Sequence, residues 1–193
     1  PSVSHAITTH AFAVEGDYFS AGEELNVQGG TGAAHADYGF FGGGVYYQHA
    51  TLDLRTLREN LNGDAARAAR ALDAFVHGLA TAQPGGKRNA FASDVQAAWI
   101  LADAGIGPTC NLALAFLKPV GPEEGDGDLV RASVERLRCF RTTLRKAYGL
   151  DGTSLVFNAW APLRAGNTPP EGEVWTLRDF QAGLRAAAGL PAA

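Results

Sequence analysis

Five histidines are the first residues to consider for chemistry, because imidazole binds metal ions and acts as a general base near neutral pH. They are His5, His10, His35, His49 and His77. His5 and His10 lie five residues apart, so on a strand they point to opposite faces and cannot chelate one ion without a bulge. No HExxH or HxE pattern supplies a carboxylate partner. We therefore expect no metal site and no catalytic residue, with a histidine-dependent hydrolase or nuclease as the alternative.

Motifs for covalent or nucleotide chemistry are missing or incomplete in this sequence. It contains no GxSxG nucleophile elbow and no SxxK pattern. Gly85-Gly86-Lys87 resembles the end of a phosphate-binding loop, but the earlier glycine is missing and Arg88 replaces the serine or threonine that would hold magnesium. The glycines at 29–32 follow no buried strand and open no helix, which argues against a dinucleotide fold. We expect no cofactor.

Two basic features are better suited to phosphate binding. Lys87-Arg88-Asn89 follows a Pro-Gly-Gly turn, where two cations and an amide can reach phosphates or base edges. Arginines recur every seven residues at Arg131, Arg138 and Arg145, on one face of a predicted helix. Such a stripe either lines a nucleic-acid groove or is a solvated face. The Lys87-Arg88-Asn89 loop likewise either contacts nucleic acid or is a solvated loop.

Composition indicates one globular domain without a membrane segment. The 193 residues are 46% apolar and 19% charged, and no stretch of 18 uncharged apolar residues occurs. The net charge of −4 gives no overall attraction to nucleic acid, and residues 1–54 contain no lysine or arginine. Cys110 and Cys139 are typical of reduced thiols in a cytoplasmic protein.

Hydrophobic patterning predicts an α+β fold with an antiparallel or mixed sheet covered on one side by helices. We predict strands at 2–14, 38–52, 95–102, 110–117 and 154–160. We predict helices from Asp53 to about Leu61, from Asp64 to the break at Gln83–Gly86, over 129–148, and from Thr176 to about Ala188. Residues 15–37 are rich in glycine and poor in large apolar residues, which indicates a long excursion with little core of its own.

The run Ser4–His10, SHAITTH, closely resembles the AHAITTH signature of the CasC family. These proteins are the repeated backbone subunits of Cascade, the type I-E CRISPR interference complex. Further motifs resemble the family's in the same order, at Asp17–Leu25, Gly32–His35, Gly44–Tyr47, Leu57–Leu61, Pro84–Ala92 and Trp175–Leu177. Ordered matches that span nearly the whole chain are more specific than any one motif.

The resemblance implies an RRM-like, ferredoxin-like palm, present in part, with an extended thumb hairpin and flanking helices. Residues 1–193 would be a single domain that forms the C-terminal portion of a larger subunit. The thumb would be an insertion at 14–38 that wedges into the duplex of guide and target and displaces nucleotides. The thumb residues it implies are Tyr18, Phe19, Leu25, Val27 and His35.

A member of this family would be a non-catalytic subunit that binds guide RNA and holds the hybrid of guide RNA and target DNA, since pairing rather than protein reads sequence. Its partners would be guide RNA (crRNA), the target DNA strand, neighbouring copies of itself and other Cascade subunits, without a membrane. The RNA-binding candidates are Lys87, Arg88, Asn89, Arg138 and Arg145. A self-associating fragment without RNA affinity is a further alternative.

Some positions depart from the family pattern. Tyr47-Gln48-His49 stands where the family has tyrosine, a basic residue and tyrosine, so a basic contact is lost or moved. Gly43-Gly44 replaces two serines, and Arg88 replaces a glutamine and adds a charge. The resemblance therefore does not carry specific contacts at these positions.

Replacing Lys87 and Arg88 together by alanine should weaken guide-RNA binding, because two charge-assisted phosphate contacts are lost. The slope of log affinity against log salt should flatten by roughly 1 to 1.5, at about 0.7 per contact on a single strand. A salt titration of the assembled protein measures this slope, and an unchanged slope would refute the contact.

Overall fold

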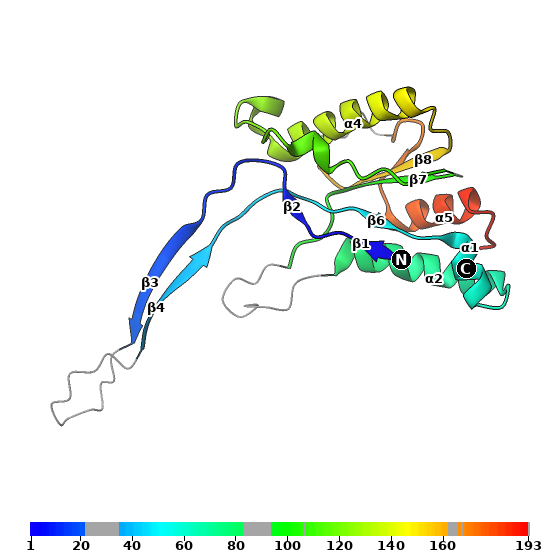
Figure 1. The fold of residues 1–193 in the computed structure, drawn as a ribbon, viewed down its shortest axis with the longest axis horizontal. Coiled ribbons are helices and arrows are strands. Elements are labelled where there is room, and N and C mark those ends of the chain that lie inside the picture. The colour runs from blue at the N-terminus through cyan, green and yellow to red at the C-terminus, as the bar shows by residue number, and fades with distance from the viewer. Residues whose placement is uncertain (22–34, 83–93, 106, 162–165, 167, 193) are drawn as a thin grey trace.

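The fold is described here from a computed structural model, which places residues 1–21, 35–82, 94–105, 107–161, 166 and 168–192. A layered body carries a two-stranded arm that projects away from it (Figure 1). In the body a small sheet lies between helix α4 on one side and helices α1, α2 and α5 on the other (Figure 1). The body is formed by residues that follow the N-terminal ribbon in the chain.

The sheet is mixed, as the sequence predicts. Its strands are β7 (Trp99–Ala104), β8 (Thr153–Asn158) and β9 (Glu173–Val174), in that order. Strand β7 pairs with β8 antiparallel, and β8 pairs with β9 parallel. Alternate residues therefore face opposite sides, so Ile100 and Ala102 enter one apolar cluster while Trp99 and Leu101 enter the other.

The larger apolar cluster joins the sheet to α1 (Leu54–Asn60), α2 (Ala65–Thr81) and α5 (Leu177–Ala187). Asp53 caps α1 and Asp64 caps α2, each by accepting backbone N–H groups of the first turn. Thr176 caps α5 in the same way through Asp179 N–H. These helix starts agree with the predicted ones, because short polar side chains mark helix starts locally.

The second cluster lies on the other face of the sheet, under α4 (Leu129–Tyr148). Asp128 caps the start of α4, and Gly149 ends it in the left-handed conformation at φ +59°. The prediction that helices cover only one face of the sheet is therefore wrong. Both faces of β7 and β8 are apolar, because their side chains alternate between two cores.

The strand predicted at 110–117 is also wrong, since Ala113–Phe116 form a 3₁₀-helix, η1. The Asn111 side chain accepts the Ala113 N–H at 3.0 Å and turns the chain there. Leu112 and Phe116 then point inward four residues apart, while Leu114 and Leu117 are exposed. A short apolar run does not distinguish a strand from a helical turn by periodicity. A second 3₁₀-helix, η2 (Glu124–Gly127), precedes α4.

The other predicted boundaries lie closer to the observed ones. The helices of the body agree with prediction, whereas the strand predicted at 95–102 begins only at Trp99. The predicted strands at 2–14 and 38–52 are each divided into short pieces. They appear as β1 (Ser2–Val3), β2 (Ile7–Thr8), β3 (Glu15–Ala21), β4 (His35–Phe41), β5 (Tyr46–Tyr47) and β6 (Ala50–Thr51).

These pieces form one long antiparallel ribbon with three paired sections. Strand β1 pairs with β6, β2 with β5, and β3 with β4, and the last pair forms the arm. Thr8 pairs with Tyr46 and Glu15 with Phe41, so the first strand carries two residues more than the second between these pairs. This mismatch interrupts the ladder and redirects the ribbon where the arm leaves the body. The arm occupies the predicted excursion.

We expect Phe180→Ala to lower the free energy of unfolding by about 3–5 kcal/mol, as for large-to-small changes in other cores. Phe180 is 1% exposed and packs on Phe157 with ring centroids 6.2 Å apart. Urea unfolding measures the change. Tyr148→Ala removes an aromatic ring that is 73% exposed and should change stability by less than about 0.5 kcal/mol. Equal effects of the two variants would contradict the assignment of this core.

Candidate nucleic-acid interface

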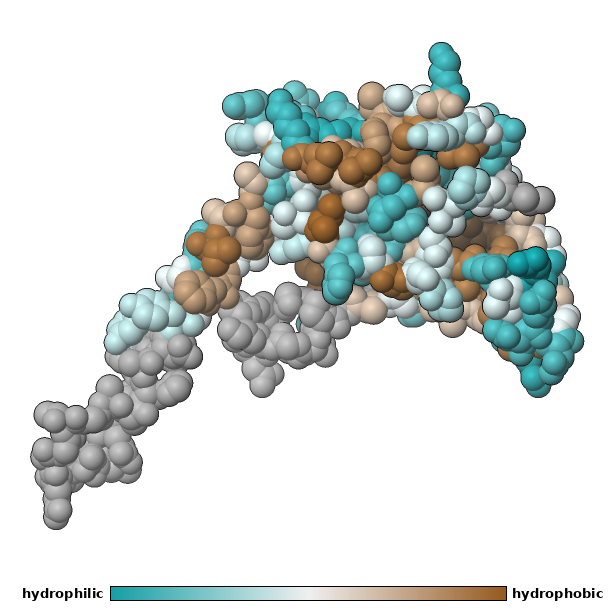
Figure 2. Space-filling model, in the orientation of Figure 1, coloured by the Kyte–Doolittle hydropathy of each residue, from teal (hydrophilic) through white to brown (hydrophobic). Residues whose placement is uncertain are grey.

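One face of the arm carries exposed aromatic rings. Tyr18 and Tyr38 are opposite each other in the β3–β4 ladder, with ring centroids 5.1 Å apart. Tyr38 and Phe40, two residues apart on one strand, are stacked at 6.4 Å with an angle of 16° between their planes. The three rings are 58%, 62% and 64% exposed. The space-filling view shows apolar residues along the base of the arm (Figure 2). Flat exposed rings of this kind are platforms on which bases stack.

The opposite face of the arm carries the carboxylates of Glu15 and Asp17 and the ring of Phe41, which pairs with Glu15 in the ladder and is 41% exposed. Glu15 and Asp17 alternate with Gly16 and Tyr18 along β3, so they point away from the aromatic face. Both carboxylates are exposed. A phosphate backbone is repelled from that face, because residues 1–54 contain no lysine or arginine to neutralise it. These carboxylates make this face of the arm unsuited to a phosphate backbone.

Thr9 fastens the ribbon to the body just before the arm begins. It is 2% exposed, and its Oγ1 lies 2.7 Å from Oγ of Ser133 in helix α4. Its backbone N–H donates to the Val45 carbonyl at 3.0 Å, and its carbonyl accepts from Val120 N–H at 2.9 Å. One threonine thus joins the two strands of the ribbon, the loop before η2, and α4.

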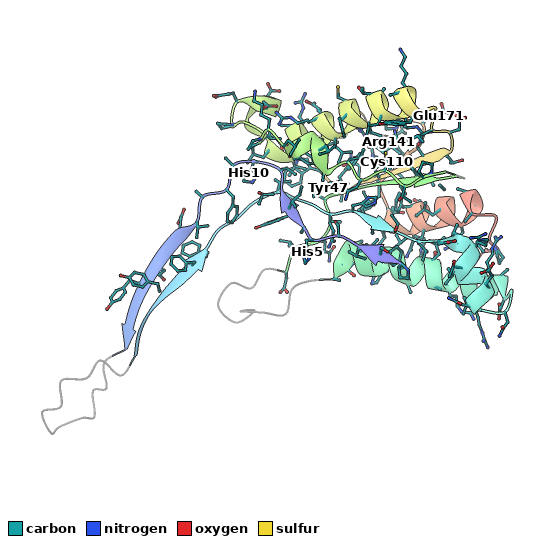
Figure 3. All side chains as sticks on the ribbon, in the orientation of Figure 1. His5, His10, Tyr47, Cys110, Arg141 and Glu171 are labelled. Carbon is teal, nitrogen blue, oxygen red and sulfur yellow. The ribbon has the colours of Figure 1, made fainter. Side chains whose placement is uncertain are left out.

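His10 follows Thr9 and connects the same two strands through its ring. Its Nε2 accepts the backbone N–H of Val45 at 3.1 Å, and its Nδ1 lies 2.8 Å from the Ala11 carbonyl. An amide only donates and a carbonyl only accepts, so these partners fit a ring whose Nδ1 donates and whose Nε2 accepts. Figure 3 shows His10 at the point where the arm leaves the body. Both ring nitrogens are occupied by bonds within the ribbon.

Tyr47 fastens the second strand. Its hydroxyl donates to Asn111 Oδ1 at 3.1 Å and accepts the Leu112 N–H at 2.9 Å. Its ring packs on Phe116 at 5.6 Å. Burial raises the pKa of the Tyr47 hydroxyl above its ordinary value, the bond from Leu112 opposing the rise, so the group stays protonated at neutral pH. The body end of the ribbon is thus held on both strands.

The arginine stripe of α4 is paired with carboxylates of the same chain. Arg131 pairs with Asp126 and Glu135, each at 3.0 Å. Arg138 lies 3.2 Å from Glu173 and stands over the Trp99 ring at 5.3 Å. Arg145 lies 3.1 Å from Asp103. Local pairing lowers the positive charge that the stripe presents to a phosphate, so its RNA contacts stay a prediction.

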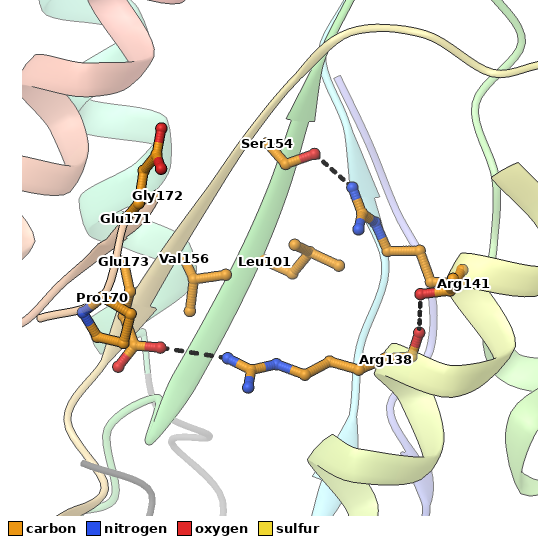
Figure 4. Close-up of a pocket in the computed structure, with 10 residues that line it drawn as sticks. Leu101, Arg138, Arg141, Ser154, Val156, Pro170, Glu171, Gly172 and Glu173 are labelled. Atoms are coloured by element: carbon orange, nitrogen blue, oxygen red, sulfur yellow. Dashed lines mark hydrogen bonds and ion pairs between the residues drawn. The ribbon is translucent and has the colours of Figure 1, made fainter. Parts of the chain in front are cut away.

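Arg138 and Arg141 reach over the sheet toward β8 and β9, where they line a pocket of about 390 Å³ (Figure 4). Arg141 donates to Asp103 through Nε at 2.9 Å and also contacts Ser154. Burial acts to raise the pKa of Asp103, but hydrogen bonds from Arg141 and Ser154 and the charges of Arg141 and Arg145 hold it below its ordinary value. Carboxylates neutralise the guanidinium groups of this pocket, which makes it a structural ion-pair network.

Of the predicted site residues that the structure describes, those of the thumb lie on the arm and Arg138 and Arg145 lie on α4. Tyr18 is on the aromatic face, and Phe19 and His35 lie in the arm strands, where their partners in the ladder are Asp37 and Ala21. Leu25 and Val27, like Lys87, Arg88 and Asn89, lie outside the described residues.

Sequence reasoning missed Tyr38 and Phe40 as members of the arm site. Their alternation with glycine, Tyr38-Gly39-Phe40, was a signal for a strand with one aromatic face. It also missed Thr9 and His10 as the residues that fasten the arm. No pattern in the sequence indicates Ser133 in α4 as the partner of Thr9.

The histidines do not converge in the part of the chain that the structure describes. No group of three or more histidine, cysteine or acidic side chains there is close enough to hold a metal ion. His49 is partly buried, which lowers the pKa of its imidazole below the ordinary value. Cys110 and Cys139 are both free thiols. None of the described helices is long and apolar enough to span a membrane.

Asp103→Asn should reduce the free energy of unfolding at pH 7 by about 1 kcal/mol, a figure kept small because the side chain is 42% exposed and solvent screens its ion pairs. The folded-state pKa of Asp103 is depressed, so its stabilisation is complete above the unfolded pKa of about 3.9 and is lost as the pH falls through the folded value. Urea unfolding at several pH values should therefore show the two proteins converging in acid.

The control for this prediction is Glu59→Gln, on the exposed surface of α1, which removes one negative charge without an ion pair to Arg141 or Arg145. It should leave the stability of the protein close to that of the parent across the same range. A constant difference for Asp103→Asn down to the lowest pH would mean that shape, not charge, makes its contribution.

Comparisons with known proteins place the chain in a family. The sequence profile described as CT1975-like protein matches residues 1–175. A solved structure named "CRISPR RNA-guided surveillance complex" contains a chain that is similar with a TM-score of 0.79 and 25% identity, covering 96% of this chain and 69% of that one. A second, "CRISPR RNA-guided surveillance complex, pre-nicking", gives 0.78 and 24%, covering 96% and 54%.

No curated protein sequence matches the chain. The α+β fold is confirmed by the structural similarity, whereas the RRM-like arrangement of the palm stays a prediction. The family resemblance seen in the motifs is confirmed by the profile. Since the profile covers residues 1–175, the chain belongs to the CT1975-like protein family.

Proposed function

We propose that this protein is a non-catalytic backbone subunit of a Cascade-type CRISPR interference complex. It binds guide RNA, holds the hybrid of guide RNA and target DNA, and contacts neighbouring copies of itself and other subunits. Similarity to chains of CRISPR surveillance complexes supports the role as a subunit. Because the chain spans 69% and 54% of those chains, the activity and partners of the whole subunit are part of the proposal.

The observation that carries the proposal is the aromatic face of the arm. Tyr18, Tyr38 and Phe40 are each more than half exposed, although together they form a continuous apolar surface. Such a surface is normally buried against something. Stacking on unpaired or splayed bases buries the apolar surfaces of both the rings and the bases. Stacking does not depend on sequence, which suits a subunit that accepts any guide.

The arm's charge supports a wedge rather than a phosphate clamp. Glu15 and Asp17 on the reverse face repel phosphates, and the aromatic face presents no cation. A ribbon with these properties separates bases most favourably where the strand is already unstacked. In this proposal, the arm is the thumb that displaces nucleotides from the hybrid.

Phosphate contacts in this proposal come from Lys87, Arg88 and Asn89 rather than from α4. Arg138 and Arg145 each have a carboxylate of this chain within 3.2 Å. Moving either guanidinium to a phosphate breaks an existing ion pair, so the exchange gains little. These two arginines have the weaker support among the proposed RNA contacts.

The competing function is a histidine-dependent nuclease. His10 argues against it, because its Nε2 accepts the Val45 N–H and its Nδ1 faces the Ala11 carbonyl. A general base needs one free nitrogen in reach of the proton it takes. Degradation of RNA or DNA that is abolished by His5→Ala, His10→Ala or His49→Ala would establish the nuclease and overturn the proposal.

Replacing Tyr38 and Phe40 together by threonine should weaken binding of the hybrid of guide RNA and target DNA by at least 10-fold, since stacking on an aromatic ring is worth about 1–3 kcal/mol per base. Threonine keeps the preference for strand conformation, so the ladder of the arm is retained. Fluorescence anisotropy with a labelled guide measures the affinity.

Tyr148→Ala is the matched control for this variant, because it removes an equally exposed ring on α4, away from the arm. It should bind the hybrid as the parent does. Equal losses in both variants would show that exposed aromatic area in general causes the binding. Undiminished binding by the double threonine variant would remove the arm from the RNA-binding surface, and no binding by the parent would favour the self-associating fragment.

A further inference from the structure

Two glycines make room for two rings where the arm joins the body. A Cβ placed on Gly42 would lie 2.4 Å from Cζ of Phe12, a distance that no Cβ tolerates. A Cβ on Gly44 would lie 3.0 Å from Nε2 of His10 and 3.2 Å from Cδ2 of Phe12. A Cβ on Gly43, between them, would meet nothing within 4 Å. The rings of His10 and Phe12 therefore lie across the opposite strand, over its two alternate glycines.

Backbone pairing does not fix the direction of the arm at this point. The described ladder ends at Thr8 and Tyr46, with one further backbone bond from Thr9 N–H to the Val45 carbonyl, and resumes at Glu15 and Phe41 with two more residues on the first strand than on the second. Beyond Thr9 and before Glu15 the two described strands are not paired in the ladder, and a bulged stretch of this kind bends the ribbon. Something other than the ladder must hold the angle between arm and body.

We propose that His10 and Phe12, packed over Gly42 and Gly44, are positioning residues that set the direction of the arm. His10 bonds across the ribbon to Val45 N–H, and Phe12 lies 6.4 Å from the Tyr46 ring with the planes tilted by 57°. Thr9, buried beside them against Ser133, connects this joint to α4. The functional role of this joint rests on the proposed function, in which the arm is the thumb. The geometry of the joint is independent of that proposal.

The glycines are needed for space and not for backbone freedom. Gly42, Gly43 and Gly44 do not have the positive φ angles found at other glycines of the chain, such as Gly63 at +78°. Alanine is therefore acceptable to the backbone at all three positions. Alanine substitutions at Gly42, Gly43 and Gly44 can therefore be compared directly. The added methyl group disturbs the joint at Gly42 and Gly44 and meets open space at Gly43.

The test measures the direction of the arm in the full chain without nucleic acid. Cys110 and Cys139 are replaced by serine, and spin labels are attached at Asp17→Cys on the arm and Glu59→Cys on α1. Gly44→Ala and Gly42→Ala should each shift or broaden the distance distribution by on the order of 5 Å, because the label at Asp17 lies five residues beyond Phe12, about 16 Å along an extended strand. Gly43→Ala should leave the distribution unchanged.

Two further variants separate the hydrogen bond from the bulk of the ring. His10→Gln keeps an acceptor that reaches Val45 N–H and should retain the parent distribution more closely than His10→Ala, which removes it. Thermal unfolding followed at the helices confirms that the body is intact in each variant. A distribution that is the same in Gly42→Ala, Gly43→Ala and Gly44→Ala would overturn the inference, as would a shift in Gly43→Ala as large as in the others.

Binding of the hybrid of guide RNA and target DNA to the same variants separates the two ideas. If Gly44→Ala moves the arm and also weakens binding, the joint positions a functional thumb. If it moves the arm while binding is unchanged, the positioning role holds and the proposed role of the arm fails. If the arm does not move, the positioning role fails whatever the affinity.

Discussion

A two-stranded ribbon has no interior, so it cannot hold its own shape in water without support. The arm of this protein depends on that constraint, because the rings of Tyr18, Tyr38 and Phe40 and the carboxylates of Glu15 and Asp17 face solvent. Its support comes from the body through a small buried contact between Thr9 and Ser133 and through the Tyr47 hydroxyl at the loop before η1. The motif SHAITTH is the segment that carries most of this attachment. Three of its polar side chains, Ser4, Thr9 and His10, bond to the second strand of the ribbon or to α4.

The body supplies a rigid mount for this attachment. Its sheet is covered on both faces, by α2 and α5 on one side and by α4 on the other. The arginines of α4 strengthen the mount, since Arg141 and Arg145 both reach Asp103 on β7 and Arg138 reaches Glu173 on β9. The same helix that receives Thr9 is thus tied to the sheet by charge as well as by apolar packing.

Local signals predicted much of this fold. Asp53, Asp64 and Gly149 mark helix ends by chemistry that acts within one turn, so those boundaries agree with prediction. The 3₁₀-helix at Ala113–Phe116 was missed because Asn111 and the Tyr47 hydroxyl decide it, and Tyr47 is distant in sequence. The second covered face of the sheet was missed because alternating apolar side chains on both sides read simply as an apolar run. The α4 arginines were correctly placed on a helix, but their carboxylate partners lie on other elements.

For the site, the family motifs located the arm, and its aromatic face became visible only when β3 and β4 were paired in register. Tyr18 lies opposite Tyr38 in the register of the ladder. The sequence pattern does not define this register, because it does not show where β3 ends and β4 begins. The loop with Lys87 and Arg88 lies outside the described residues, so its role rests on chemistry and family resemblance alone.

The acidic reverse face of the arm has a consequence for how copies of this chain meet. Both edges of a two-stranded ribbon have unpaired backbone groups, which invite another ribbon to add on and begin an aggregate. If two arms were to pair side by side, Glu15 and Asp17 of one would crowd those of the other, and like charges in register oppose such pairing. The carboxylates thus oppose edge-to-edge pairing of two arms, and the aromatic face remains exposed.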